Sequence, residues 1–237
     1  MKKLSAIVPA AGIGLRLKSK TAKPYISLNN KPLLWYCLNA LERSEKIKDI
    51  IVSCGKANIR RTERLIKKYK FKKIKAVVAG GPTRSASVYN GLMALDTDTD
   101  YVLIHDGARP FLDDELIDKC FRSVIKHKAV ICAVECSSTI KKADKNLRVI
   151  STLDRNSLWQ VQTPQVFAYR LMLKAYENLK NRKGGFFDDA SLVERLGQKV
   201  KIVQGHNMNI KITTPEDLRI ARAILKTQGK YASRLWL

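Results

Sequence analysis

Short apolar runs recur along the first half of the chain, at residues 6–8, 50–52, 76–79, 102–104 and 129–134. Unbroken runs of this length are typical of strands buried on both faces of a parallel sheet. Between them, apolar residues at i, i+3 and i+4 spacing predict helices at 33–41, 59–69, 84–95 and 116–125. Because strand and helix alternate, we predict an α/β fold with a Rossmann-like, mostly parallel sheet flanked by helices.

The rhythm changes in the second half of the chain. Short alternating segments at 139–142 and 148–153 flank Asp144, Lys145 and Asn146, which favour a turn. They predict a β-hairpin arm that spans about residues 136–167 and projects from the domain. Two strands cannot bury both of their faces alone, so the arm would pack against the same arm of a second chain. We therefore expect a homodimer.

After the arm, the pattern predicts helices near 169–179 and 188–196, a strand at 200–204 and a last helix from Thr214 to about Gln228. Thr214 can cap that helix, Pro215 fits its first turn, and Glu216 and Asp217 complement its dipole. We predict a single domain over residues 1–228 and a C-terminal tail, 229–237, without a functional signal.

The chain is strongly basic, with 45 Lys and Arg against 21 Asp and Glu and a net charge of +24. Such a charge could indicate a nucleic-acid-binding protein, which is the alternative from another class. The lysines are spread over predicted helices and strands, however, and no known nucleic-acid-binding motif accompanies them. We favour a solvated surface that also attracts an anionic substrate, and we expect no specific nucleic acid as partner.

The cysteines contain no CxxC pair, and their odd count, 5, argues against a disulfide framework. We expect buried, reduced thiols at Cys37, Cys54, Cys120, Cys132 and Cys136. Neither a signal peptide nor an apolar run of about 20 residues is present, so we expect no membrane partner and a cytoplasmic protein.

The first candidate site follows the first strand, where residues 9–14 form a small-residue loop with two glycines. Exposed backbone N–H groups of such a loop bind phosphate, and Arg16 and Lys23 add charge, which points to a nucleoside triphosphate. A dinucleotide fingerprint is not completed, because Leu17 stands at the third small position and no acid follows about 20 residues on. A P-loop is excluded by the missing Gly-Lys-Ser/Thr.

Two further loops follow predicted strands. Gly80 and Gly81 would allow a base or ribose to approach closely, and Ser87 offers a hydroxyl, although a turn with a helix cap explains them equally well. Asp106 would face the same crevice as the first loop, because ligands of open α/β sheets bind at the carboxyl ends of the strands. It could accept from ribose hydroxyls or help to hold a magnesium ion, or it could cap a helix. His105 lacks a His or Cys partner and is expected to be structural.

Taken in order, these segments resemble the 2-C-methyl-D-erythritol 4-phosphate cytidylyltransferase family. The resemblance covers residues 4 to about 228 and rests on Pro9-Ala10-Ala11-Gly12, Lys23-Pro24-Tyr25, Gly80-Gly81 with Ser87, His105-Asp106-Gly107-Ala108-Arg109-Pro110, Asp154-Arg155-Asn156, Thr163-Pro164-Gln165, Asp188-Asp189-Ala190-Ser191 and Asn209-Ile210-Lys211. It implies a fold of the nucleotide-diphospho-sugar transferase type. It also implies a dimeric, magnesium-dependent enzyme of the nonmevalonate isoprenoid pathway that joins a polyol phosphate to CMP from CTP and releases pyrophosphate.

The resemblance also implies roles for individual residues. The set that would cradle CTP is Ala10, Ala11, Gly12, Gly14, Gly80, Gly81 and Ser87, with Asp106 near the ribose and the metal. Arg16, Lys23 and Lys211 would be the catalytic cations. The residues facing the polyol phosphate would be Arg109, Thr139 and Lys211, with Arg155 and Thr163 reaching across from the partner's arm.

Two departures from the family pattern affect these roles. The common Pro-Lys-Gln-Tyr is Ala22-Lys23-Pro24-Tyr25 here, and proline removes a backbone donor. Phe187 replaces a threonine before the Asp-Asp-Ala-Ser run, which removes a hydroxyl. A related ribitol 5-phosphate cytidylyltransferase remains the alternative within the class, but that family usually has a Leu-Ala-Gly-Gly loop where Pro9-Ala10-Ala11-Gly12 stands.

The implied reaction needs no general base. A phosphate monoester has its second pKa at about 6, so the attacking group is already an anion. This agrees with a chain in which His105, His127 and His206 form no catalytic pair. The difficulty is the repulsion between two anions, which the cations and magnesium would offset.

Overall fold

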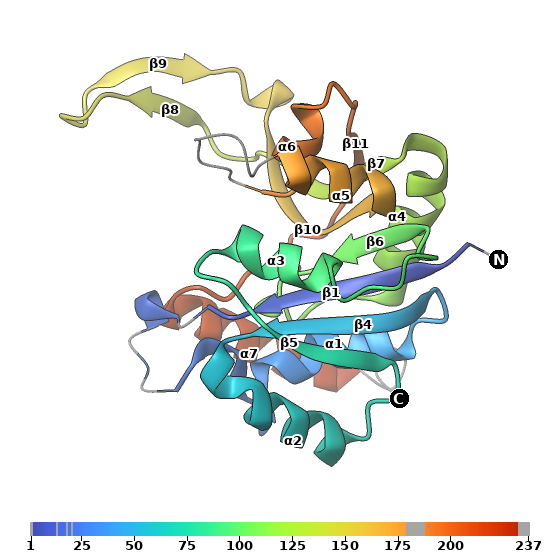
Figure 1. Cartoon of the computed structure of the whole chain (residues 1–237). Helices are drawn as coiled ribbons and strands as arrows, with labels where there is room; N and C mark the ends of the chain where they lie inside the picture. The colour runs from blue at the N-terminus through green and yellow to red at the C-terminus, as the bar shows by residue number, and fades with distance from the viewer. Residues whose placement is uncertain (1, 13, 18, 20, 179–187, 232–237) are drawn as a thin grey trace.

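The computed structural model describes residues 2–231 except for residues 13, 18, 20 and 179–187. Its centre is a seven-stranded sheet in the order β11-β7-β10-β6-β1-β4-β5 (Figure 1). The strands are β1 (Leu4–Ala10), β4 (Ile47–Cys54), β5 (Ile74–Ala79), β6 (Tyr101–Ile104), β7 (Ala129–Glu135), β10 (Trp159–Ala168) and β11 (Lys201–Gln204). Neighbouring strands are parallel except at β10, which is antiparallel to both β6 and β7. The predicted α/β class and mostly parallel sheet are confirmed.

Helices cover both faces of the sheet. Side chains of β1 alternate between the two cores: Ala6 and Val8 join one hydrophobic cluster and Ile7 the other. The first cluster includes α1 (Leu33–Arg43), α2 (Ile59–Tyr69) and α4 (Asp114–His127). The second includes α3 (Arg84–Leu92), α5 (Tyr169–Glu177) and α6 (Ala190–Glu194). A third cluster joins α7 (Pro215–Tyr231) to α1 and to the hairpin of β2 (Ser27–Leu28) and β3 (Lys31–Pro32).

The predicted hairpin arm is present. Strands β8 (Ile140–Ala143) and β9 (Val149–Leu153) form a separate two-stranded sheet that projects from the body (Figure 1). The Asp144 carboxylate accepts the backbone N–H groups of Asn146 and Arg148 at 2.9 and 2.8 Å. The expected turn residues therefore close the hairpin as their chemistry predicts.

The far boundary of the arm, predicted at about residue 167, is wrong. Residues 159–168 form β10, whose second half is buried in the middle of the main sheet. The prediction places this segment in the projecting arm. Gln162 and Gln165 are buried nevertheless, because their amides donate to the His206 carbonyl and the Asp188 carboxylate at 2.9 and 2.8 Å. Pro164 falls where the β10–β7 register shifts, so its missing N–H breaks no ladder bond there.

Other boundaries move by a few residues. Helix α3 ends at Leu92, and α7 continues to Tyr231, so part of the predicted tail is helical. The division into one domain over 1–228 and a tail stays a prediction. All five cysteines are free and buried, as expected. Within the described residues, no helix is both long enough and apolar enough to cross a membrane.

Candidate active site

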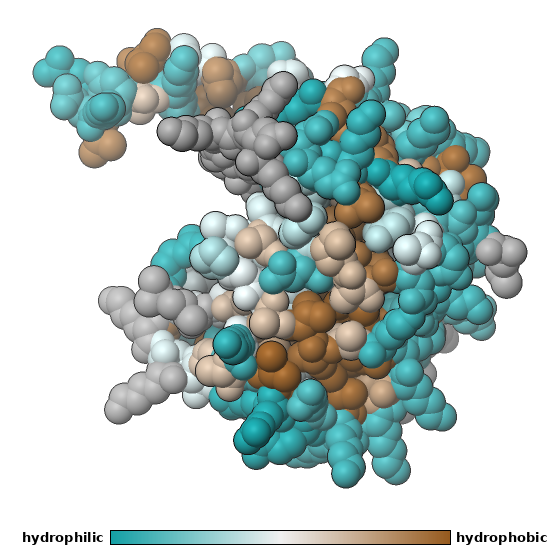
Figure 2. All heavy atoms as spheres, viewed as in Figure 1, coloured by the Kyte–Doolittle hydropathy of each residue, from teal (hydrophilic) through white to brown (hydrophobic). Residues whose placement is uncertain are grey.

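A cavity of about 220 Å³ lies where β1 and β6 end, at the carboxyl edge of the parallel strands. Figure 2 shows a hollow on the left of this view, between the arm and the lower part of the body. The cavity is lined by the end of β1 and the loop after it, by the start of α3 and the residues before it, by the loop after β6, and by two lysines. The lining residues are Pro9, Ala10, Ala11, Gly12, Lys23, Pro24, Gly81, Pro82, Thr83, Arg84, Ser87, Asp106, Gly107, Ala108 and Lys211. The structure therefore brings together loops that the sequence placed after separate strands.

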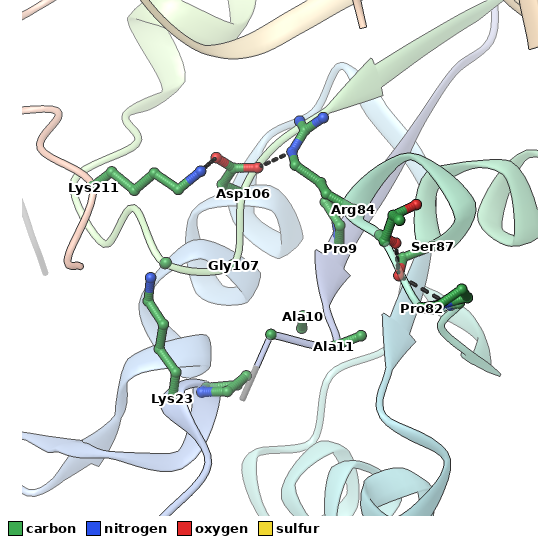
Figure 3. Close-up of a pocket in the computed structure, with 15 residues that line it drawn as sticks. Pro9, Ala10, Ala11, Lys23, Pro82, Arg84, Ser87, Asp106, Gly107 and Lys211 are labelled. Carbon is green, nitrogen blue, oxygen red and sulfur yellow. Dashed lines mark hydrogen bonds and ion pairs between the residues drawn. The ribbon is translucent and has the colours of Figure 1, made fainter. Parts of the chain in front are cut away.

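Asp106 is the centre of charge in this cavity. Its Oδ1 lies 2.8 Å from Nε of Arg84, and its Oδ2 lies 2.7 Å from Nζ of Lys211 (Figure 3). Burial raises the pKa of this carboxyl, but Arg84 and Lys211 outweigh burial and hold the pKa well below its usual range. Asp106 is therefore ionised at neutral pH.

Lys23 lines the cavity on the side of the first loop, which contains Ala10 and Ala11 (Figure 3). Burial and the positive charge of Lys211 lower the pKa of Lys23 to about 8, although Asp106 opposes this shift. Gly14 has a φ of +72°, and a Cβ there would lie 2.7 Å from the Cβ of Lys23, so glycine is required by both backbone and space. Pro24 sits in the first turn of the 3-10 helix Lys23–Tyr25, where a missing N–H is tolerated, so the departure from the family pattern keeps Lys23 in place.

The shifted pKa of Lys23 predicts a pH dependence. If protonated Lys23 binds the triphosphate, kcat/KM for the nucleotide will fall as pH rises through about 8, because this parameter reports the free enzyme. The kcat limb will lie at higher pH, since bound phosphates favour the charged amine. In Lys23→Arg the guanidinium does not titrate, so the decline should be absent up to pH 9 in initial-rate profiles. A decline that persists in Lys23→Arg assigns it to another group.

The second glycine loop packs against the first. A Cβ on Gly80 would lie 2.5 Å from the Cβ of Ala11 and 2.8 Å from Oγ of Ser87. The Ser87 hydroxyl donates to the Thr83 carbonyl at 2.9 Å and accepts the Gly81 N–H at 3.1 Å. In this structure Gly80 and Ser87 therefore hold the two loops together. Ala11, Gly81 and Ser87 line the cavity, whereas Gly80 lies behind its lining.

Behind the cavity lies a layer of buried polar side chains. Thr163 lies in β10 and not on the arm, so the expectation that it reaches across from a partner's arm is wrong. Its Oγ1 accepts the Asp106 N–H at 3.1 Å and contacts Nδ1 of His105 at 3.1 Å. Burial lowers the pKa of His105 to about 4, and its Nε2 lies 3.1 Å from the Arg109 carbonyl, so this histidine is a neutral structural group, as expected.

Arg109 belongs to the same buried layer. Its side chain is 10% exposed, its Nη1 donates to the Asn209 carbonyl at 2.6 Å, and its Nε lies 4.0 Å from Oδ2 of Asp106. It is not among the residues that line the cavity. Lys211 lies outside the helices and strands, in a segment held by the bond from Ile212 N–H to the Ala108 carbonyl at 2.9 Å.

Besides Arg109 and Thr163, the predicted residues Gly14, Arg16, Gly80, Thr139 and Arg155 are not among the residues that line the cavity. Arg16 is exposed in the 3-10 helix Leu15–Leu17 that follows the first loop, and its charge contributes to lowering the pKa of Lys23, so the two side chains lie close enough to interact electrostatically. Thr139 and Arg155 are exposed at the base of the arm, where Nη1 of Arg155 donates to the Ser137 carbonyl at 3.1 Å. Phe187, the second departure from the family pattern, lies outside the described residues.

Sequence reasoning gave no role to Arg84 or Asp189. Arg84 contacts both Asp106 and Asp189, which is fully buried. One signal could have found it: Arg84 is the first residue of α3, and a cation there opposes the helix dipole, so a nearby anion is expected.

Among the described residues no group of three or more His, Cys, Asp or Glu side chains could hold a metal ion. Asp106 is the carboxylate among the described lining residues, and each of its oxygens has a cationic partner. One carboxylate together with nucleotide phosphates and water is a normal ligand set for Mg²⁺. The residues therefore fit a magnesium ion carried by a nucleotide, provided that Asp106 exchanges one cation for it.

A cavity at the carboxyl edge of a mostly parallel sheet, between two glycine loops and lined by converging cations, defines a nucleotide-binding α/β enzyme. The model of the 2-C-methyl-D-erythritol 4-phosphate cytidylyltransferase family matches residues 4–227. The chain belongs to this family, and the resemblance seen in the sequence is confirmed.

Individual relatives agree over nearly the full length. The 2-C-methyl-D-erythritol 4-phosphate cytidylyltransferase of Pelotomaculum thermopropionicum is 42% identical over 235 residues, which cover 98% of both chains. That of Lachnoclostridium phytofermentans is 45% identical over 229 residues, 95% of this chain and 97% of its own. The solved 4-diphosphocytidyl-2C-methyl-D-erythritol synthase from Anaerococcus prevotii has a TM-score of 0.85 at 37% identity and covers 95% of this chain and 96% of its own.

Proposed function

We propose that this chain transfers CMP from CTP to 2-C-methyl-D-erythritol 4-phosphate, giving 4-diphosphocytidyl-2-C-methyl-D-erythritol and pyrophosphate. The observation that carries this proposal is the convergence of Lys23 and Lys211 on one glycine-lined cavity in a chain of this family. We also propose that the enzyme acts in the cytoplasm.

The chemistry follows from the charges. An oxygen of the polyol phosphate attacks the α-phosphorus of CTP, a new P–O bond forms, and the bond to the β-phosphate oxygen breaks to release pyrophosphate. The nucleophile is an anion at neutral pH, so no base has to remove a proton. Lys23 and Lys211 oppose the repulsion between the two phosphates and stabilise the charge that builds on the equatorial oxygens and the leaving group.

The proposed division of roles follows the two sides of the cavity. The loops that contain Ala10, Ala11, Gly12, Gly14, Gly80, Gly81 and Ser87 cradle CTP, with Asp106 near its ribose. Arg16 and Lys23 bind its phosphates. Lys211 orients the polyol phosphate, while the buried Arg109 and Thr163 support Asp106 and the Asn209 segment from behind. Mg²⁺ bound through the phosphates would neutralise part of their charge.

A direct assay tests the reaction. Pyrophosphate release is measured with CTP and Mg²⁺ and with either 2-C-methyl-D-erythritol 4-phosphate or ribitol 5-phosphate. We expect turnover with the first substrate only; turnover with the second alone assigns the alternative substrate. Salt-dependent binding to random duplex DNA without turnover on either substrate favours the nucleic-acid alternative.

A homodimer built through the arm is part of the proposal. The arm exposes large apolar side chains that a monomer leaves in water: Leu147 is 88%, Val149 61% and Ile150 59% exposed. A second copy covering them would gain about 25 cal/mol for each Å² removed from water. The same contact would bring Thr139 and Arg155 of one chain toward the cavity of the other, where the family resemblance places them.

Charging the arm should separate the dimer. We expect the double change Val149→Asp with Ile150→Asp to convert a dimer into a monomer at micromolar concentration in sedimentation velocity, and to raise KM for the polyol phosphate. As the matched control, Ile125→Asp changes an exposed isoleucine on α4 and should leave the mass unchanged. A wild-type protein that sediments as a monomer would contradict the dimer directly.

A further inference from the structure

The two oxygens of Asp106 are shared between two cations that differ in freedom. Arg84 holds Oδ1 and Lys211 holds Oδ2, from opposite sides of the carboxylate (Figure 3). The Lys211 side chain is 40% exposed and comes from a loop, whereas Arg84 is 29% exposed and begins helix α3. Lys211 can therefore leave Asp106 by rotating its own side chain.

Arg84 is fixed at its other end. Its Nη1 lies 2.7 Å from Oδ2 of Asp189, a carboxylate with no exposed surface. Asp189 also accepts the Tyr176 hydroxyl at 2.6 Å, and its N–H donates to Oε1 of Gln165 at 3.2 Å. A fully buried carboxylate is costly without a cationic partner. The planar guanidinium of Arg84 holds the two carboxylates with two different nitrogens in a fixed geometry, Nε for Asp106 and Nη1 for Asp189. We call this series of contacts, Tyr176–Asp189–Arg84–Asp106, the brace; it connects α5 to the cavity.

We propose that Arg84 is a positioning residue of the transfer reaction: it holds and neutralises Asp106, so that Lys211 can leave this carboxylate and bind the incoming polyol phosphate. The inference rests on the proposed function. Without Arg84, the close partner of Asp106 would be Lys211, because Nε of Arg109 lies 4.0 Å away. Lys211 would then stay on Asp106 and be lost to the substrate.

Arg84→Lys tests this directly, because it keeps the positive charge and replaces the two separate donors, Nε and Nη1, with one flexible ammonium nitrogen. We expect KM for the polyol phosphate to rise by about 10-fold or more while the Kd of CTP, measured by calorimetry without the second substrate, changes less than about threefold. The matched control is Arg64→Lys on α2. Arg64 is exposed, and its Nε donates to the Arg60 carbonyl one helical turn earlier, so this variant should behave as wild type.

A double-mutant cycle separates positioning from a general structural role. In a Lys211→Ala background, Arg84→Lys should add less than about twofold to KM for the polyol phosphate, because the residue it acts through is gone. Asp189→Asn, which weakens the brace and leaves Arg84 in place, should shift the same KM in the same direction. This second variant keeps the test informative if Arg84→Lys folds poorly by circular dichroism.

The outcomes distinguish the two levels of the proposal. The positioning role is overturned if Arg84→Lys raises the Kd of CTP and the KM of the polyol phosphate by the same factor. It is also overturned if the effects of Arg84→Lys and Lys211→Ala on this KM are fully additive. Wild-type kinetics in both Arg84→Lys and Asp189→Asn overturn it as well. Failure of the wild-type protein to release pyrophosphate from CTP and 2-C-methyl-D-erythritol 4-phosphate would instead refute the proposed function itself.

Discussion

Lys23→Ala is expected to lower kcat by about 10²-fold or more, as the loss of one preorganised donor at developing charge often does. Lys23 is half-buried beside the first loop, and burial already disfavours its charge. Its ammonium is therefore poorly solvated before substrate arrives, so an approaching phosphate replaces little water and interacts strongly. Single-turnover measurements of pyrophosphate release with saturating CTP give the relevant rate.

The control for this prediction is Lys67→Ala, which removes an exposed lysine of α2 and makes the same change in net charge. It separates a local role of Lys23 from the general attraction of a basic surface for anions. A Lys23→Ala variant with unchanged kcat and a raised KM for CTP would make Lys23 a binding residue only. Loss of activity in both variants would show that net charge matters more than position.

The sheet could be predicted because its parallel strands are buried on both faces. Almost every side chain of strands such as β1 and β7 is buried, so their sequences consist mainly of apolar residues. Strand β10 could not be predicted in the same way. Its buried Gln162 and Gln165 are satisfied by partners 44 and 23 residues further along the chain, and no local pattern shows that such partners exist.

The residues of the candidate site likewise fall into those that could be predicted from the sequence and those that could not. Loops that follow parallel strands must meet at one edge of the sheet, which is why residues 9–14, Gly81 and Asp106 could be expected in one cavity. The Arg84–Asp189 pair joins residues 105 positions apart. The place of Arg84 at the start of α3 indicates that an anion is near, but nothing local shows that this anion is Asp189. Long-range ion pairs of this kind come from tertiary packing, which the hydrophobic pattern does not encode.

Gly80→Ala is the second change with a large expected effect. Its Cβ would lie 2.5 Å from the Cβ of Ala11 and 2.8 Å from Oγ of Ser87, so one of the two loops must move. Ala11 belongs to the first loop, which lines the cavity, and Ser87 accepts the Gly81 N–H at 3.1 Å, so a shift at this contact moves residues on both sides of the cavity. Overpacking of this kind costs about 1–3 kcal/mol of stability.

The effect on activity should exceed the effect on stability, because a displacement of about 1 Å at a reacting geometry can lower the rate by about 10²-fold. We expect kcat/KM for CTP to fall by about that factor, while thermal unfolding shows a folded protein. Gly55→Ala is the matched control: its φ of −56° suits any residue, and its Cβ would meet only the Asn58 amide at 3.4 Å and the Ala11 carbonyl at 3.9 Å. Near-wild-type kinetics in Gly80→Ala would show that the two loops move apart without cost to the nucleotide site, and would remove Gly80 from the proposed CTP cradle.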